Sequence, residues 1–250
     1  MLTQVTGFPG FDVLLSRLAE NRGLPVADLS RLSAVPEAEL RAVLEGAAPG
    51  LPLLRRLSPV FQLAAEDLCV FAAVALPLEM TPLDPRAGME VARLARHAAR
   101  SPRDGRDHLR RLAQRLPQEH RTQPVPEPRA HLQYPPGPGA LLMRLLANRN
   151  LGWLAGAQTF LHLTGRYWSA ATYGQVGHGL MELTPDLLAD YATVLGIRAD
   201  DLAALTGVDP PDRTAPPSEV AADVTGLMWD VRRLTLDQIE QLRDTAESMR

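Results

Sequence analysis

The stretch LLSRLAENRGL at residues 14–24 returns as LLMRLLANRNL at residues 141–151. Both copies keep the leucine pair, an Arg-Leu pair, an Asn-Arg pair and the final leucine. A second echo follows in the same order, because Leu53-Leu54 with AEDL at 65–68 matches Leu187-Leu188 with ADDL at 199–202. The chain therefore carries two copies of one small unit.

The two copies differ in length. The first echo is offset by 127 positions and the second by 134, so the second copy holds seven extra residues between Leu151 and Leu187. We expect these residues to extend the turn at 164–168 or the loop around Gly177 and Gly179.

Composition indicates an all-α protein. Apolar residues make up 46% of the 250 residues, and no segment sustains the alternation of a strand. The longest apolar run, at 68–78, is too short to cross a bilayer, and no signal peptide opens the chain. We therefore expect a cytoplasmic protein without a membrane segment. The single cysteine, Cys69, sits among apolar residues and is expected to be a small buried side chain.

Each copy reads as five short helices. In the first copy, prolines at 25 and 36 stand where helices begin, and Gly23 and Gly46 where helices end. In the second copy, helices are expected at 151–163 and 169–176. Thr184-Pro185-Asp186 predicts a helix start, with Thr184 as the N-cap and Gly196 as the stop.

The rest of the chain forms a connector and a tail. Residues 88–116 have a helical pattern, with expected breaks at Ser101-Pro102 and Asp104-Gly105, and residues 86–121 carry ten arginines against four acids. Residues 122–139 are rich in proline and predict a stiff, extended linker. After Pro217, apolar stripes and a capping box at Thr235 and Gln238 predict two further helices. The predicted regions are a first domain at 1–76, a basic connector and linker at 77–136, a second domain at 137–208 and an acidic helical tail at 209–250.

The order of helices resembles that of the phage-repressor family of helix-turn-helix domains, the lambda-repressor and Cro type. ADLSRLSAV at 27–35 and the helix ending in LEG at 44–46 resemble the second and third helices of that family, and residues 53–67 resemble its closing pair. The resemblance covers about 11–75 and, more loosely, 140–208. It implies two five-helix domains, a third helix that lies in the major groove of DNA, and a role in transcriptional regulation.

The first copy is expected to be a poor DNA reader. Its third helix presents Glu37, Ala38, Arg41, Ala42 and Glu45 outward, and acidic side chains repel phosphates. Val26 also stands where the family commonly has a phosphate-contacting glutamine. We expect the first domain to serve in structure or pairing.

The second copy is the predicted reader, because residues 128–181 contain no Asp or Glu. Its polar and basic side chains suit phosphate and base-edge contacts. The predicted contact residues are Arg149, Arg166, Tyr167, Ser169, Thr172, Tyr173, Gln175 and His178. Two alternatives stay open: the aromatic residues fill the core, and Arg149, like its counterpart Arg22, pairs with a carboxylate.

The connector has two interpretations of equal weight. Arg110 and Arg111, together with Arg41 of the first domain, are candidate phosphate contacts that carry no sequence information. The same basic face could instead pair with the acidic tail.

No enzyme motif occurs in the chain. The sequence lacks a phosphate-binding glycine loop after a strand, a nucleophile motif and a metal-ligand cluster. His97, His108 and His120 are too widely spaced for a zinc pair, and exposed histidines are expected. We expect no enzymatic activity, no cofactor and no metal.

The sequence favours a DNA-binding transcriptional regulator. The expected partners are double-stranded DNA and a second copy of the chain, held through the tail or the first domain. The alternative is a scaffold whose helix-turn-helix units have lost DNA binding and hold a protein partner; the net charge of −3 favours this alternative slightly.

Overall fold

The computed structural model describes residues 7–119, 121, 127–210 and 217–249. The predicted all-α fold is confirmed, since this part of the chain contains fourteen α-helices, three short 3₁₀ helices and no strand. No helix in these ranges is long and apolar enough to cross a membrane. The outer limits of the predicted first domain and tail, and part of the proline-rich linker, lie outside the described residues.

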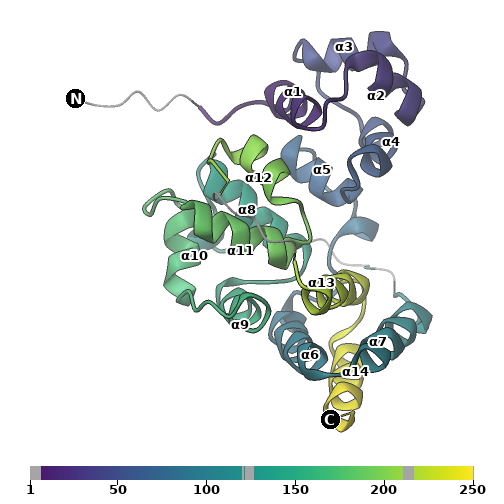
Figure 1. Cartoon of the computed structure of the whole chain (residues 1–250), viewed down its shortest axis with the longest axis vertical. Helices are drawn as coiled ribbons and strands as arrows, with labels where there is room; N and C mark the ends of the chain where they lie inside the picture. Colours follow the sequence, from purple (N-terminus) through teal and green to yellow (C-terminus); the bar gives the residue numbers. More distant parts are fainter. Residues whose placement is uncertain (1–6, 120, 122–126, 211–216, 250) are drawn as a thin grey trace.

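The first helical unit consists of five helices at one end of the molecule (Figure 1). They are α1 (Phe11–Asn21), α2 (Val26–Ser33), α3 (Glu37–Leu44), α4 (Leu51–Phe61) and α5 (Ala65–Phe71). Leu14, Leu15 and Leu18 bury one face of α1, and Gly23 leaves the helix with a φ of +61°. Three residues join α2 to α3, and the first of them, Ala34, has a left-handed φ of 55°. Cys69 is buried as expected, and burial raises the pKa of its thiol to about 11.

The second helical unit repeats this order. It contains α8 (Pro138–Asn148), α9 (Trp153–Thr164), α10 (Ala170–Gly177), α11 (Pro185–Leu195) and α12 (Ala199–Thr206). The predicted start of α11 is confirmed, because the Thr184 side chain accepts a hydrogen bond from the Leu187 amide. Gly196 ends this helix in the left-handed conformation, also as predicted.

The predicted place of the seven extra residues was wrong for four of them. Helix α9 has 12 residues where α2 has 8, so four of the seven lengthen a helix. Of the other three, two enlarge the turn before α10, which spans residues 165–169 where the first unit has only 34–36. The last lies in the following loop, at 178–184 against 45–50. The longer α9 gives the connector helix α6 a surface on which to pack.

The connector forms α6 (Gly88–Arg100) and α7 (Arg103–Arg115). The break at Ser101-Pro102 is confirmed. The break expected at Asp104-Gly105 was wrong, since both residues lie inside α7. A Cβ on Gly105 would lie 3.4 Å from the Ser101 Cβ, which is close to ordinary van der Waals contact. The 3₁₀ helices cover Leu78–Met80, Pro85–Ala87 and Ala130–Leu132, so the linker contains a turn where the sequence predicted only extended chain.

The tail helices α13 (Glu219–Val231) and α14 (Leu236–Ser248) pack against α6 and α7 (Figure 1). The predicted capping box of Thr235 and Gln238 is present. The apolar stripe at Val224, Leu227, Met228 and Val231 is fully buried. The connector and the second unit of the same chain therefore cover the tail, and one continuous apolar core joins all parts.

Candidate nucleic-acid interface and the junction of the helical units

Helix α10 presents a short polar face to solvent. Ser169 caps the helix by accepting a hydrogen bond from the Thr172 amide, and its hydroxyl lies 3.0 Å from the Thr172 hydroxyl. Ala171 and Gln175, one helical turn apart, are exposed. Of the predicted contacts on or beside α10, Ser169 and Gln175 are exposed and Thr172 is partly exposed.

Tyr173 lies on the opposite side of α10. Its ring is fully buried, with edge-to-face contacts to Phe160 and Tyr191 at centroid distances of 5.0 and 6.1 Å. Burial raises the pKa of its phenol well above its usual value, and within the described part of the chain its hydroxyl has no hydrogen-bond partner. The predicted DNA contact at Tyr173 was therefore wrong, and the core alternative describes this residue.

The turn before α10 carries the most exposed aromatic side chain of the predicted interface, Tyr167, which is 70% exposed. Its neighbour Arg166 is half exposed and lies 3.2 Å from Asp186 and 4.0 Å from Asp190. Trp168 turns inward, and its indole nitrogen donates to Asp190 at 2.7 Å. Burial raises the pKa of the Asp190 carboxyl, although this hydrogen bond opposes the shift.

His178 belongs to an aromatic cluster with the linker. Its Nε2 lies 3.0 Å from the His131 carbonyl oxygen, and its ring contacts Tyr134 at 4.9 Å. The Trp153 indole donates to the Tyr134 hydroxyl at 2.6 Å. Gly177 makes room for the cluster, because a Cβ there would lie 2.6 Å from the Tyr134 ring. His178 is thus half-buried and holds the linker against α10.

Arg149 is buried at the junction of the two units. Its guanidinium donates to both carboxylate oxygens of Asp67, at 3.1 and 2.9 Å, and to the Leu195 carbonyl at 2.6 Å. Asn148 adds a hydrogen bond to the same carboxylate at 3.0 Å. The predicted DNA contact at Arg149 was wrong, and the alternative of a carboxylate partner is the one observed.

An equivalent contact joins an arginine of the first unit to an aspartate of the second. Arg22 of the first unit donates to both carboxylate oxygens of Asp201, at 2.8 and 2.6 Å, and to the Phe61 carbonyl at 3.0 Å. Asn21 donates to Asp201 at 2.9 Å. Phe61 and Leu195 are the last residues of α4 and α11, so the aspartate, the asparagine and the helix-end carbonyl of one contact each have a counterpart in the other; Arg149 additionally donates to the Leu145 carbonyl at 3.0 Å. We call these two contacts the reciprocal clamps; they pair the units as a two-fold axis pairs two subunits.

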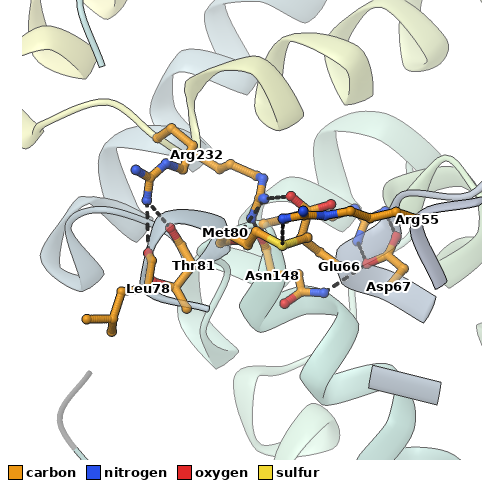
Figure 2. A network of polar contacts seen from close by, with 10 residues as sticks. Arg55, Glu66, Asp67, Leu78, Met80, Thr81, Asn148 and Arg232 are labelled. Atoms are coloured by element: carbon orange, nitrogen blue, oxygen red, sulfur yellow. Dashed lines mark hydrogen bonds and ion pairs between the residues drawn. The ribbon is translucent and has the colours of Figure 1, made fainter. Parts of the chain in front are cut away.

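The tail reinforces the clamp at Asp67 (Figure 2). Arg232 pairs with Glu66, the neighbour of Asp67, and donates to the Met80 carbonyl at 2.8 Å. The Arg149 and Arg232 guanidinium carbons lie 4.9 and 4.3 Å from the centre of the Trp229 ring. Burial lowers the pKa of Arg232. The sequence repeat contains the clamp residues, but the sequence does not show that the aspartates of the AEDL and ADDL segments bind the Asn-Arg pairs of the other copy.

The third helix of the first unit carries the acidic face that the sequence predicts. Ala38, Glu39, Arg41, Ala42 and Glu45 are exposed. Arg41 pairs with Glu37 at 2.5 Å, one turn earlier on α3.

The connector arginines pair with the tail. Arg103, Arg106 and Arg110 bind Glu219, Asp223 and Asp230 of α13 at 2.7, 2.8 and 3.1 Å, respectively. For Arg110 the tail-pairing interpretation is therefore the observed one, whereas Arg111 is exposed.

No group of three or more His, Cys, Asp or Glu residues in the described ranges could hold a metal ion. His108 is exposed as expected, but the expectation for His97 was wrong, since it is buried; His120 lies outside the described residues. Comparisons with protein-family models, with curated proteins and with solved structures found no match.

Proposed function

We propose that the protein is a DNA-binding transcriptional regulator in which the second helical unit contacts the duplex. The observation that carries this proposal is the polar face of α10. Ala171 and Gln175 point to solvent beside the exposed Tyr167 and the half-exposed Arg166, within a run of sequence that contains no acid.

The chemistry of these side chains suits a duplex. A glutamine amide can bind adenine through two hydrogen bonds, and an arginine can bind guanine or a phosphate. Small residues such as Ala171 allow close approach of the helix to base edges. Arg144, exposed on α8, is available for a phosphate. Arg149 and Tyr173 are not part of this proposal, because both are buried.

The reciprocal clamps pair the two helical units within one chain, which bears on how many chains are needed to bind DNA. Helix-turn-helix regulators commonly present two units related by two-fold symmetry. Here both units belong to one chain, and the apolar stripe of the tail is buried within it. We propose that the chain acts as a single-chain equivalent of such a dimer, in place of the homodimer through the tail or the first domain that the sequence predicts.

The test is binding to sheared genomic DNA, measured by fluorescence anisotropy at two salt concentrations, followed by selection of a specific site. Gln175→Ala and Arg166→Ala should each weaken specific binding by about 1–3 kcal/mol, whereas Arg41→Ala on the acidic helix should have little effect. Equal losses for all three variants, or none, would contradict the assignment to α10.

A second function is favoured by the charges of the other surfaces. Helix α3 is acidic, and three of the connector arginines, Arg103, Arg106 and Arg110, pair with acids of the tail, which reduces the basic surface left for phosphates. These features suit a scaffold for protein interaction. The absence of binding to any DNA at low salt would favour the scaffold over the regulator.

A further inference from the structure

A groove of about 1230 Å³ lies where all parts of the chain meet. Its walls come from the loop between α4 and α5, the equivalent loop between α11 and α12, the end of α9, and the helices α7 and α13. Asp67 and Arg149 of one reciprocal clamp line it as well. The groove therefore touches both helical units and the contact that pairs them.

The walls combine apolar surface with ion pairs. Trp229 of the tail supplies accessible apolar surface, and Leu63 of the first unit and Ile197 of the second, which are 6% and 5% exposed, also line the groove. Arg198 pairs with Asp200, and Arg110 pairs with Asp230. An apolar cleft with a few polar groups is the usual form of a small-molecule site.

In both pairs the arginine is more exposed than its acid. The side chains of Arg198 and Asp200 are 56% and 39% exposed, and those of Arg110 and Asp230 are 38% and 18% exposed. The guanidinium side chain is therefore the more accessible partner in each of these pairs. Arginine binds a carboxylate or a related anion through two parallel hydrogen bonds.

We propose that this groove binds an amphipathic organic anion, whose apolar body lies against Leu63, Ile197 and Trp229 and whose head group binds Arg198. Arg198 is assigned this role because it is the most exposed of the paired arginines that line the groove, and because it lies on the loop between the two closing helices of the second unit.

The position of the groove makes the ligand an effector. A ligand that contacts both units stabilises one relative arrangement of them, and it can change the affinity for DNA only through that preference. This part rests on the proposed function, whereas binding of the anion does not.

The test uses the full chain without DNA. The fluorescent probe 1-anilinonaphthalene-8-sulfonate is an amphipathic anion, and we expect it to bind with its fluorescence enhanced. Ala222→Trp fills the groove from α13 and should abolish this binding, whereas Ala147→Trp, exposed on α8 and outside the groove, should not. Loss of binding in neither variant, equal loss in both, or no binding by the parent protein would overturn the proposal.

The head group is tested by competition. Decanoate should displace the probe at lower concentration than decanol, which has the same chain without the charge. Arg198→Gln should weaken decanoate binding about tenfold, the effect of one charge-assisted hydrogen bond, and leave decanol unchanged. Equal displacement by both compounds, or an unchanged affinity in Arg198→Gln, would overturn the assignment of an anion.

The effector role is measured separately. Decanoate should shift DNA affinity in the parent protein and not in Ala222→Trp. Probe binding without DNA binding would overturn the proposed function alone, and DNA binding without probe binding would overturn only the groove.

Discussion

The two buried aspartates explain why the repeated Asn-Arg pairs occur. Asp67 and Asp201 are almost wholly inaccessible, and a buried carboxylate is tolerated only when paired and hydrogen-bonded. Each receives an arginine through two hydrogen bonds and an asparagine through one. At the scale of single residues, truncation of one arginine side chain in a clamp would therefore leave a buried aspartate without its compensating charge.

Arg149→Ala should lower the free energy of unfolding by about 3–5 kcal/mol, because Asp67 would stay buried without its cation. Arg144→Ala is the matched control, since Arg144 is exposed on the same helix, and it should change stability by less than about 0.5 kcal/mol. Urea denaturation measures both. Similar small effects for the two variants would show that Arg149 is not buried against Asp67.

Asp190 gives a pH dependence. Burial raises the pKa of its carboxyl above the ordinary value of about 3.9, so its contribution to stability is complete below that value and is lost as the pH rises through the raised pKa. The Asp190→Asn variant has no ionisable carboxyl at this position, so it does not lose stability in this way as the pH rises. The free energy of unfolding of the variant, relative to the parent, should rise as the pH increases above about pH 4. Urea denaturation at several pH values measures it, and a difference that stays constant with pH would contradict the assignment.

At the scale of helices, the sequence predicts much of the fold. The caps at Thr184 and Thr235 are local signals, because each side chain bonds an amide three residues away. The repeat predicts two units with equal helix order. Contacts between distant segments are not local, and so the pairing of Arg22 with Asp201 could not be derived, while a carboxylate partner for Arg149 and a core position for Tyr173 were only open alternatives. The predicted helix at 151–163 agrees with α9 to within two residues, whereas its contact with α6 joins distant segments and was not predicted.

Replacement of two glycines in the second unit by alanine should have opposite effects on the stability of the protein. At Gly177 a Cβ would lie 2.6 Å from the Tyr134 ring and 2.8 Å from Met143, so Gly177→Ala should cost about 1–3 kcal/mol through overpacking. At Gly156 the nearest atom would be 3.9 Å away, so Gly156→Ala should gain up to about 1 kcal/mol from helix propensity. Thermal unfolding compares them. If Gly177→Ala proves neutral, the linker does not lie against α10.

Substitution of two neighbouring arginines on α7 distinguishes pairing with the tail from contact with DNA. Arg110→Glu places a carboxylate beside Asp230 and should lower the melting temperature, whereas Arg111→Glu, at an exposed position, should not. Calorimetry measures the temperatures, and anisotropy with random duplex DNA measures binding. A loss of DNA affinity at Arg110 without a loss of stability would contradict the pairing of α7 with α13.

At the scale of the whole molecule, the two units contact each other directly and differ in the elements that surround them. The first unit contacts the second through α1 with α12 and through α5 with α8, which are matching helix pairs. Connector and tail pack together and cover α9 of the second unit, while α2 and α3 remain at the free end (Figure 1). The copies are thus equal in fold and unequal in surroundings, which leaves them free to take different roles.

The central claim is that the two copies bind each other through the reciprocal clamps. A double-mutant cycle with Arg22→Ala, Asp201→Ala and the double variant tests it most directly, because the two residues are 179 positions apart in the chain. We predict a coupling energy of about 1–3 kcal/mol in urea denaturation. The control cycle of Arg31→Ala with Asp201→Ala should give a coupling near zero, since Arg31 pairs with Asp28 within α2. A coupling between Arg22 and Asp201 no larger than that of the control would contradict the pairing of the two units.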